Sequence, residues 1–178
     1  MAAPLQSNTV HSTNNSNNAT LTMATPTTGS WMVVASSWGS GATTTAITSG
    51  GFGVTTWTKA KEQNNGTASG TVIWYGKVDT TLTTTCVLNY SAKVGSNDLF
   101  GYEIAKTDIT GTSPLDQTAS ATGTGTAPAV TAAAQNGYAY DINIAAIAPS
   151  ATPTKPAAYS EPTNIANATV GKSCYKYC

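Results

Sequence analysis

Residues that could do chemistry are few in this 178-residue sequence, and its single histidine, His11, is the clearest candidate. An imidazole can act as a general base at neutral pH, and a Ser-His-Asp triad uses one to activate its serine. His11 lies in a polar N-terminal segment, which would have to fold over the rest of the chain and be fixed there. We therefore expect His11 to be an exposed side chain without a catalytic role.

Three cysteines could supply metal ligands or a disulfide. Cys174 and Cys178 are close enough to close a small C-terminal loop, or they lie free, and both alternatives stay open. Cys86 is remote from both, and His11 is at the other end of the sequence, so the four Cys or His ligands of a structural zinc site do not cluster. We expect no metal site and no cofactor.

The carboxylates are spread along the chain rather than paired. Aspartates at predicted loops and strand ends often bind Ca²⁺, but none here forms a D-x-D-x-D run: Asp79, Asp98, Asp108, Asp116 and Asp141. Glycoside hydrolysis needs two carboxyls across a cleft, and the glutamates fall on three separate segments: Glu62, Glu103 and Glu161. Glu103 lies on the small-residue face of a predicted strand, where we interpret it as a hydrogen-bonded structural residue. The sequence predicts no enzyme and no catalytic residue.

Aromatic side chains allow a different chemistry, because sugars stack on exposed rings. Trp38 precedes Gly39-Ser40-Gly41 at the end of a predicted strand, so we expect it to be the most exposed ring. Most of the other large rings are expected to fill the core, but together they could form a sugar-binding platform: Trp31, Trp57, Trp74, Tyr75, Tyr138 and Tyr140.

The amino-acid composition limits the kinds of partner that the chain can bind. Lysines supply all eight basic residues, eight acidic residues balance them, and charged residues make up only 9% of the chain. Without arginine or a basic excess, nucleic acid is a poor partner. The first residues carry no basic and apolar signal, and no 18 apolar residues run together, so we expect no secretion signal and no membrane span.

In the segments that must position these residues, side chains of different kinds alternate with a period of two residues, which is typical of β-strands. Gly, Asn and Ser separate the segments, and Asn65-Gly66 predicts a hairpin between the second and third of them. No helical period of useful length occurs. The predicted strands are 30–38, 55–62, 71–79, 83–90, 99–106 and 137–147, with weaker candidates at 115–124 and 128–133. This pattern predicts an all-β fold, an antiparallel β-sandwich of Ig-like or jelly-roll type.

The patterned segments lie between two unpatterned ends. Residues 1–29 are rich in Asn, Ser and Thr, and residues 149–178 carry four prolines, which favour extended chain. We therefore expect a polar N-terminal arm at 1–29, a β-sandwich domain at 30–148 and a Pro-rich C-terminal arm at 149–178.

Five segments also support a comparison with a known family: 26–34 (PTTGSWMVV), 54–60 (VTTWTKA), 71–78 (TVIWYGKV), 99–104 (LFGYEI) and 113–126 (SPLDQTASATGTGT). In order and spacing they resemble a β-sandwich module that recurs in phage virion proteins and in large secreted bacterial proteins. The resemblance covers about residues 20–148. It implies a buried tryptophan at Trp57 and a role in attachment, decoration or display, without catalytic residues. The chain departs from the family in Gly76, after Tyr75, and in its cysteine-bearing tail.

These observations together predict a non-enzymatic structural protein located in a virion, either a capsid decoration protein or a tail accessory protein. Its expected partners are the major capsid or tail protein and further copies of itself, as a homo-oligomer, with the arms as connectors. The alternative is a carbohydrate-binding or adhesin module, at a fibre tip or on a secreted protein, with a glycan as partner.

Overall fold

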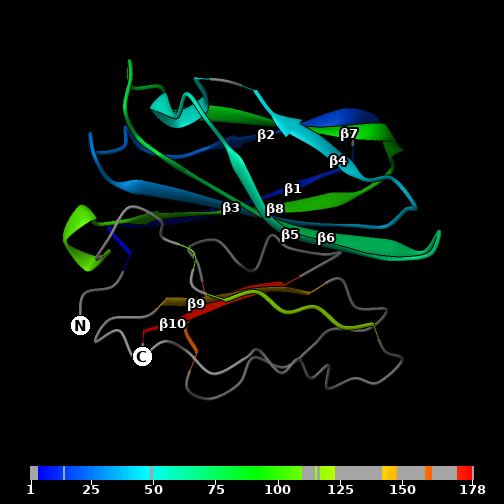
Figure 1. Ribbon diagram of the computed structural model, residues 1–178. Helices are drawn as coiled ribbons and strands as arrows, with labels where there is room; N and C mark the ends of the chain where they lie inside the picture. The colour runs from blue at the N-terminus through cyan, green and yellow to red at the C-terminus, as the bar shows by residue number, and fades with distance from the viewer. Residues whose placement is uncertain are drawn as a thin grey trace.

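Two antiparallel sheets packed against each other form the centre of the described part of the chain, so the predicted all-β sandwich is confirmed (Figure 1). The structure is a computed structural model that describes residues 4–13, 15–48, 50–109, 115, 117–122 and 159–161. It also describes the backbone of residues 142–147 and 172–177. No helix in these ranges is long and apolar enough to cross a membrane.

The larger sheet has five strands in the order β1-β8-β3-β6-β5, and the smaller has three in the order β2-β7-β4. The larger consists of β1 (Gln6–Ser12), β8 (Asn97–Ile104), β3 (Trp31–Trp38), β6 (Ser69–Lys77) and β5 (Thr58–Asn65). The smaller consists of β2 (Ser16–Thr22), β7 (Thr85–Val94) and β4 (Thr44–Ile47). Two 3₁₀ turns, η1 (Gly51–Gly53) and η2 (Lys106–Asp108), complete the described elements of the sandwich.

A third layer lies on the outer face of the five-stranded sheet. It consists of β9 (Ile142–Ile147) paired antiparallel with β10 (Lys172–Tyr177), and β9 lies against β3 and β6 (Figure 1). The C-terminal part of the predicted strand at 137–147 is therefore confirmed. Residues 172–177, placed in the predicted C-terminal arm, form a strand instead, and most of the remaining predicted arm lies outside the described residues.

The central strand β3 is buried on both faces. Met32 and Val34 point into the core between the sheets, and Val33 and Ala35 point the other way into a second apolar cluster with Phe100. A strand covered on both sides shows no polar alternation, because neither face meets water. This second cluster explains why the five-stranded sheet needs a further layer over it.

The predicted N-terminal arm is wrong for residues 6–22, which supply one strand to each sheet. β1 pairs with β8, and β2 pairs with β7, each antiparallel. The pairing is driven by apolar residues at alternate positions of β2 and just after it: Ala19, Leu21 and Met23 are all buried in the core. The polar residues between them face solvent, so a composition average hides a strand pattern.

The predicted hairpin is confirmed between β5 and β6, with Gly66 in a left-handed conformation at its turn (φ 58°). Gly76, the departure from the family pattern, is required here, because a Cβ at that position would collide with Val54 and with the carbonyl oxygen of Thr56. Residues 115 and 117–122, part of a weaker predicted strand, do not lie in a strand, and 128–133 lies outside the described residues.

Candidate functional site

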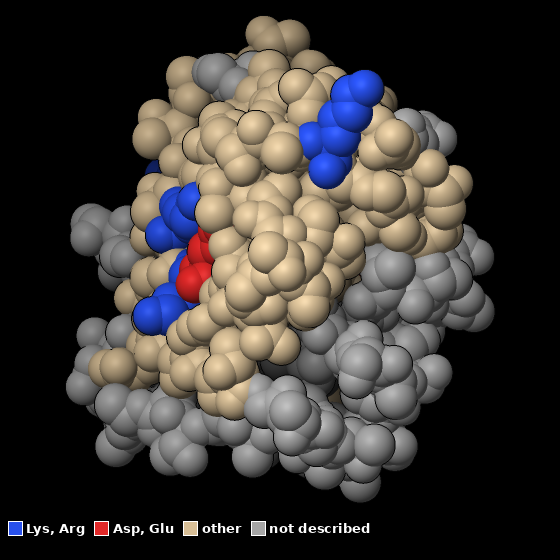
Figure 2. Space-filling view, turned by 90° about the vertical axis from the view of Figure 1, so that its right-hand side faces the viewer, with Lys and Arg blue, Asp and Glu red and all other residues tan. Residues whose placement is uncertain are grey.

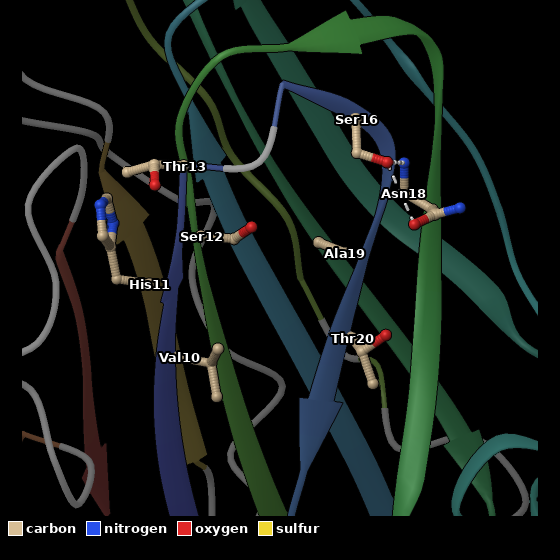
Figure 3. A pocket seen from close by; sticks show the side chains of 8 residues that line it. All are labelled: Val10, His11, Ser12, Thr13, Ser16, Asn18, Ala19 and Thr20. Atoms are coloured by element: carbon tan, nitrogen blue, oxygen red, sulfur yellow. Dashed lines mark hydrogen bonds between the residues drawn. The ribbon is translucent and has the colours of Figure 1, made fainter.

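A hollow of about 440 Å³ opens between β1 and β2, where the edges of the two sheets meet (Figure 3). Its lining includes His11 and is otherwise made of small polar and small apolar residues: Val10, Ser12, Thr13, Ser16, Asn18, Ala19 and Thr20. On this flank, the edge strand β1 of the larger sheet lies beside the edge strand β2 of the smaller sheet.

Two side-chain amides of β1 close the flank on one side of the hollow. The Asn8 amide nitrogen donates to the carbonyl oxygen of Thr22 at 2.7 Å, and the Gln6 amide nitrogen donates to that of Ala24 at 3.1 Å. Both donors sit at alternate positions of β1, so they share one face. The next residues on that face are Val10 and Ser12, which cannot reach across as the longer amides do. The hollow begins where this series of amides ends.

His11 is not the exposed, unengaged side chain that the sequence predicts. Its Nδ1 is 2.7 Å from Oδ1 of Asp98, and its side chain is 21% exposed, whereas that of Asp98 is fully buried. The contact follows from strand pairing, because His11 and Asp98 are directly opposite in the β1–β8 ladder. Figure 3 shows that the His11 side chain points away from the hollow, to the other face of β1 from Val10 and Ser12.

The order of groups around this pair differs from that of a Ser-His-Asp triad. Ser37 of β3 is directly opposite Asp98 on the other side of β8, so the row across the sheet reads His11, Asp98, Ser37. A triad needs the imidazole between the serine and the carboxylate. Here the carboxylate is in the middle, and Ser12 is on the opposite face of its strand, so neither serine is placed for activation by His11.

Glu103 is a buried structural carboxylate, 2% exposed. One oxygen accepts a hydrogen bond from the Gln6 amide nitrogen and the other from the Thr27 backbone N–H, both at 2.6 Å. These donors come from the start of β1 and from the loop before β3. The carboxylate therefore fastens the N-terminal segment to β8 at the end of the flank opposite the hollow.

Asp108 lies in η2, where it accepts a bond of 3.4 Å from the neighbouring Thr107 hydroxyl. Two other carboxylates of the sandwich join separate segments. Glu62 accepts hydrogen bonds from the hydroxyl of Thr44 and from Lys59 Nζ, both at 2.6 Å, which ties β5 to β4. Asp79 accepts from the backbone N–H and hydroxyl of Thr55. No three His, Cys, Asp or Glu residues cluster as metal ligands within the described ranges. Asp116 and Asp141 lie outside those ranges.

The prediction that Trp38 is exposed is wrong. Its side chain is fully buried, its indole N–H donates to the Ala42 carbonyl oxygen at 2.9 Å, and its ring meets that of Tyr90 edge-on at 5.4 Å. Trp57, expected to be buried, is only half-buried against the core. Because Trp38 is fully buried, its ring has no free face on which a sugar could stack. Tyr138 and Tyr140 lie outside the described residues.

The cysteines offer no reactive site in the described sandwich. Cys86 is buried, and burial raises the pKa of its thiol to about 12. A thiol with so high a pKa stays protonated and is a poor nucleophile or ligand. Cys174 lies on β10, opposite Ala145 of β9. Cys178 lies outside the described residues, so both alternatives for this pair, bridged or free, stay open.

Charges cover little of the surface. Figure 2 shows one face on which lysine and carboxylate side chains occupy a small share of the described surface, most of which is formed by uncharged residues. On strand β5, Lys59 and Glu62 form an ion pair, with Lys61 between them in sequence. The surface that a partner meets is therefore built mainly from hydroxyl, amide and methyl groups.

No protein-family model, curated protein or solved structure matches this chain.

Proposed function

We propose that this chain is a non-enzymatic structural protein of a virion, a capsid decoration protein or a tail accessory protein, that binds neighbouring virion subunits. The observation that carries the proposal is the use of its carboxylates. Glu62, Glu103, Asp79 and Asp98 each accept hydrogen bonds from the chain's own side chains or backbone, at four separate places. Such groups hold a scaffold together, and they are not gathered for acid-base chemistry.

The surface that remains suits close packing of many copies. Because the net charge is zero and only 9% of residues are charged, adjacent copies do not repel one another. Many weak contacts then add up through multivalent attachment to a repetitive particle. The sequence resemblance to a module of phage virion proteins points in the same direction.

Particle association tests the proposal. Virions of the virus that encodes the chain are purified on a density gradient, washed in low salt and in 1 M NaCl, and analysed by quantitative peptide mass spectrometry. We expect the chain in a fixed ratio to the major capsid or tail protein. We also expect it to resist the 1 M NaCl wash, because salt screens ionic contacts and leaves contacts between uncharged surfaces intact.

Absence of the chain from washed virions would contradict the proposal. An added control separates attachment from trapping: purified chain is mixed with particles that lack it, and with the same particles already saturated by it. Specific attachment occurs only on the first.

A further inference from the structure

The edges of the sandwich differ in how they are protected against pairing with another chain. An edge strand presents unpaired peptide groups, and charged side chains are the common guard against unwanted strand addition. β5 carries Lys59, Lys61 and Glu62 along its length. β2 reads SNNATLT and has no charged residue and no proline. Of these two edge strands, β2 is the unguarded one.

The peptide groups that β2 presents can be identified from its register. The backbone N–H of Met23 donates to Thr84, so the residues of β2 that bond to β7 are the odd-numbered ones, Ala19 and Leu21. Peptide groups in an antiparallel strand alternate in direction. Those of Asn18, Thr20 and Thr22 therefore point away from β7. The bond from Asn8 to the Thr22 carbonyl oxygen agrees with this direction.

Only the part of β2 beside the hollow is open to a partner. The carbonyl oxygen of Thr22 already accepts a hydrogen bond from Asn8. Asn18 and Thr20 line the hollow, and both side chains are exposed. The backbone N–H of Asn18 has one local contact, to the hydroxyl oxygen of Ser16 at 3.3 Å (Figure 3). This long local bond can be exchanged for a straighter one to an incoming strand.

We propose that a second copy of the chain pairs with this edge, β2 against β2, antiparallel about a twofold axis at Ala19. In that register Asn18 is opposite Thr20 of the second copy, and Thr20 is opposite its Asn18. Both members of each pair turn their peptide groups outward, as the hydrogen-bonded pairs of an antiparallel ladder require. The edge is therefore complementary to itself, and each pair forms two backbone hydrogen bonds.

The side chains and charges fit the same arrangement. Thr20 lies beside Asn18 of the other copy, a hydroxyl-amide pair without like charges. The contact joins two three-stranded sheets into one continuous sheet of six strands. A closed twofold pair is also the commonest form of homo-oligomer. The inference rests on the proposed function in that it names the contact through which copies would assemble.

Lysine substitution tests the pairing with a matched control. Thr20→Lys places two like charges at the twofold interface, and Thr45→Lys places the same charge on an exposed threonine of β4, the other edge strand of the same sheet. The dissociation constants of the full-length variants are measured by sedimentation velocity over a concentration series. We expect a wild-type dimer and a dissociation constant at least about tenfold higher for Thr20→Lys, which corresponds to about 1.4 kcal/mol. Thr45→Lys is expected to match the wild type.

A second variant keeps the charge unchanged. Thr20→Pro removes an outward N–H that the sandwich does not use, and edge strands tolerate proline at such positions. We expect weaker dimerisation with a normal thermal transition. Amide hydrogen exchange supplies a local readout, since protection of Thr20 should rise with protein concentration.

A wild-type chain that stays monomeric at every concentration overturns the inference, whatever else binds the hollow. Equal dimerisation of the two lysine variants also overturns it, because the dimer then uses another surface. The outcome is separable from that of the proposed function. A β2-linked dimer missing from washed virions contradicts only the virion role, and a virion protein that is monomeric in isolation contradicts only the pairing.

Discussion

The pair of His11 and Asp98 makes a quantitative prediction, because one partner is fully buried and the other is not. Replacing His11 by alanine leaves the Asp98 carboxylate buried without its 2.7 Å hydrogen bond. Hydrogen bonds to charged groups contribute about 1.5–3 kcal/mol, and we expect His11→Ala to lower the free energy of unfolding by about 2–3 kcal/mol. For a chain of this length that is a drop of roughly 5–10 °C in Tm.

A substitution of the other partner, Asp98, should lower the free energy of unfolding by less. Asp98→Asn leaves His11 with access to water and removes a buried charge, so the two single changes are not equivalent. Urea unfolding of His11→Ala, Asp98→Asn and the double variant gives the coupling energy, and Ser12→Ala, on the other face of β1, should stay within about 0.5 kcal/mol of the wild type. Strict additivity of the two single effects, or a larger loss for Asp98→Asn, would refute this reasoning.

Three further predictions follow from single contacts. Gly70→Ala places a methyl group against the buried Trp38 ring and should cost about 1–3 kcal/mol in urea unfolding, whereas Gly39→Ala, with open space around it, should be neutral. Cys86, with its pKa raised to about 12, should stay unmodified by a thiol reagent at pH 8 until the protein is denatured, as peptide mapping can show. Glu62→Gln weakens the bonds to β4 and should lower Tm by a few degrees, measured by calorimetry.

The sandwich itself could be predicted wherever apolar residues dominate a segment. The strands β3 and β6, and the Asn65-Gly66 turn before β6, follow directly from sequence. The boundaries of β5 and β7 are displaced by several residues toward the C-terminus from the predicted ones. Pairing with a neighbouring strand, rather than the segment's own pattern, decides where such strands begin and end.

Four of the observed strands, β1, β2, β4 and β10, were not predicted, and the first two lie in the segment that we interpreted as a polar arm. β1 contains only one large aliphatic residue, Val10, and its remaining positions read as a polar arm. Ala19, Leu21 and Met23 did carry an alternating signal, but it lies in a segment dominated by Asn, Ser and Thr. A short window over residues 19–23 could have found β2, while β1 is recognisable only once β8 is in place beside it.

The candidate site was harder to predict than the fold, since its contacts join residues far apart in sequence. His11 and Asp98 are 87 positions apart, and Thr27 and Glu103 are 76 apart. No local motif signals such pairs. The exposed position expected for Trp38 failed for a related reason: the glycine-rich loop after it turns back, and its Ala42 carbonyl accepts the indole N–H.

The N-terminal segment shows how a polar composition can be structural without an apolar core of its own. Gln6, Asn8 and His11 each place a donor or acceptor against a group of another segment: Glu103, the Thr22 carbonyl and Asp98. Of these, Glu103 and Asp98 are buried. An unmade hydrogen bond of a buried charge costs more than a made one contributes. Deleting residues 1–29 would therefore remove two edge strands. It would also take hydrogen-bond partners away from two buried carboxylates, those of Glu103 and Asp98. Such a deletion cannot separate attachment from folding, whereas a single exposed change at Thr20 can.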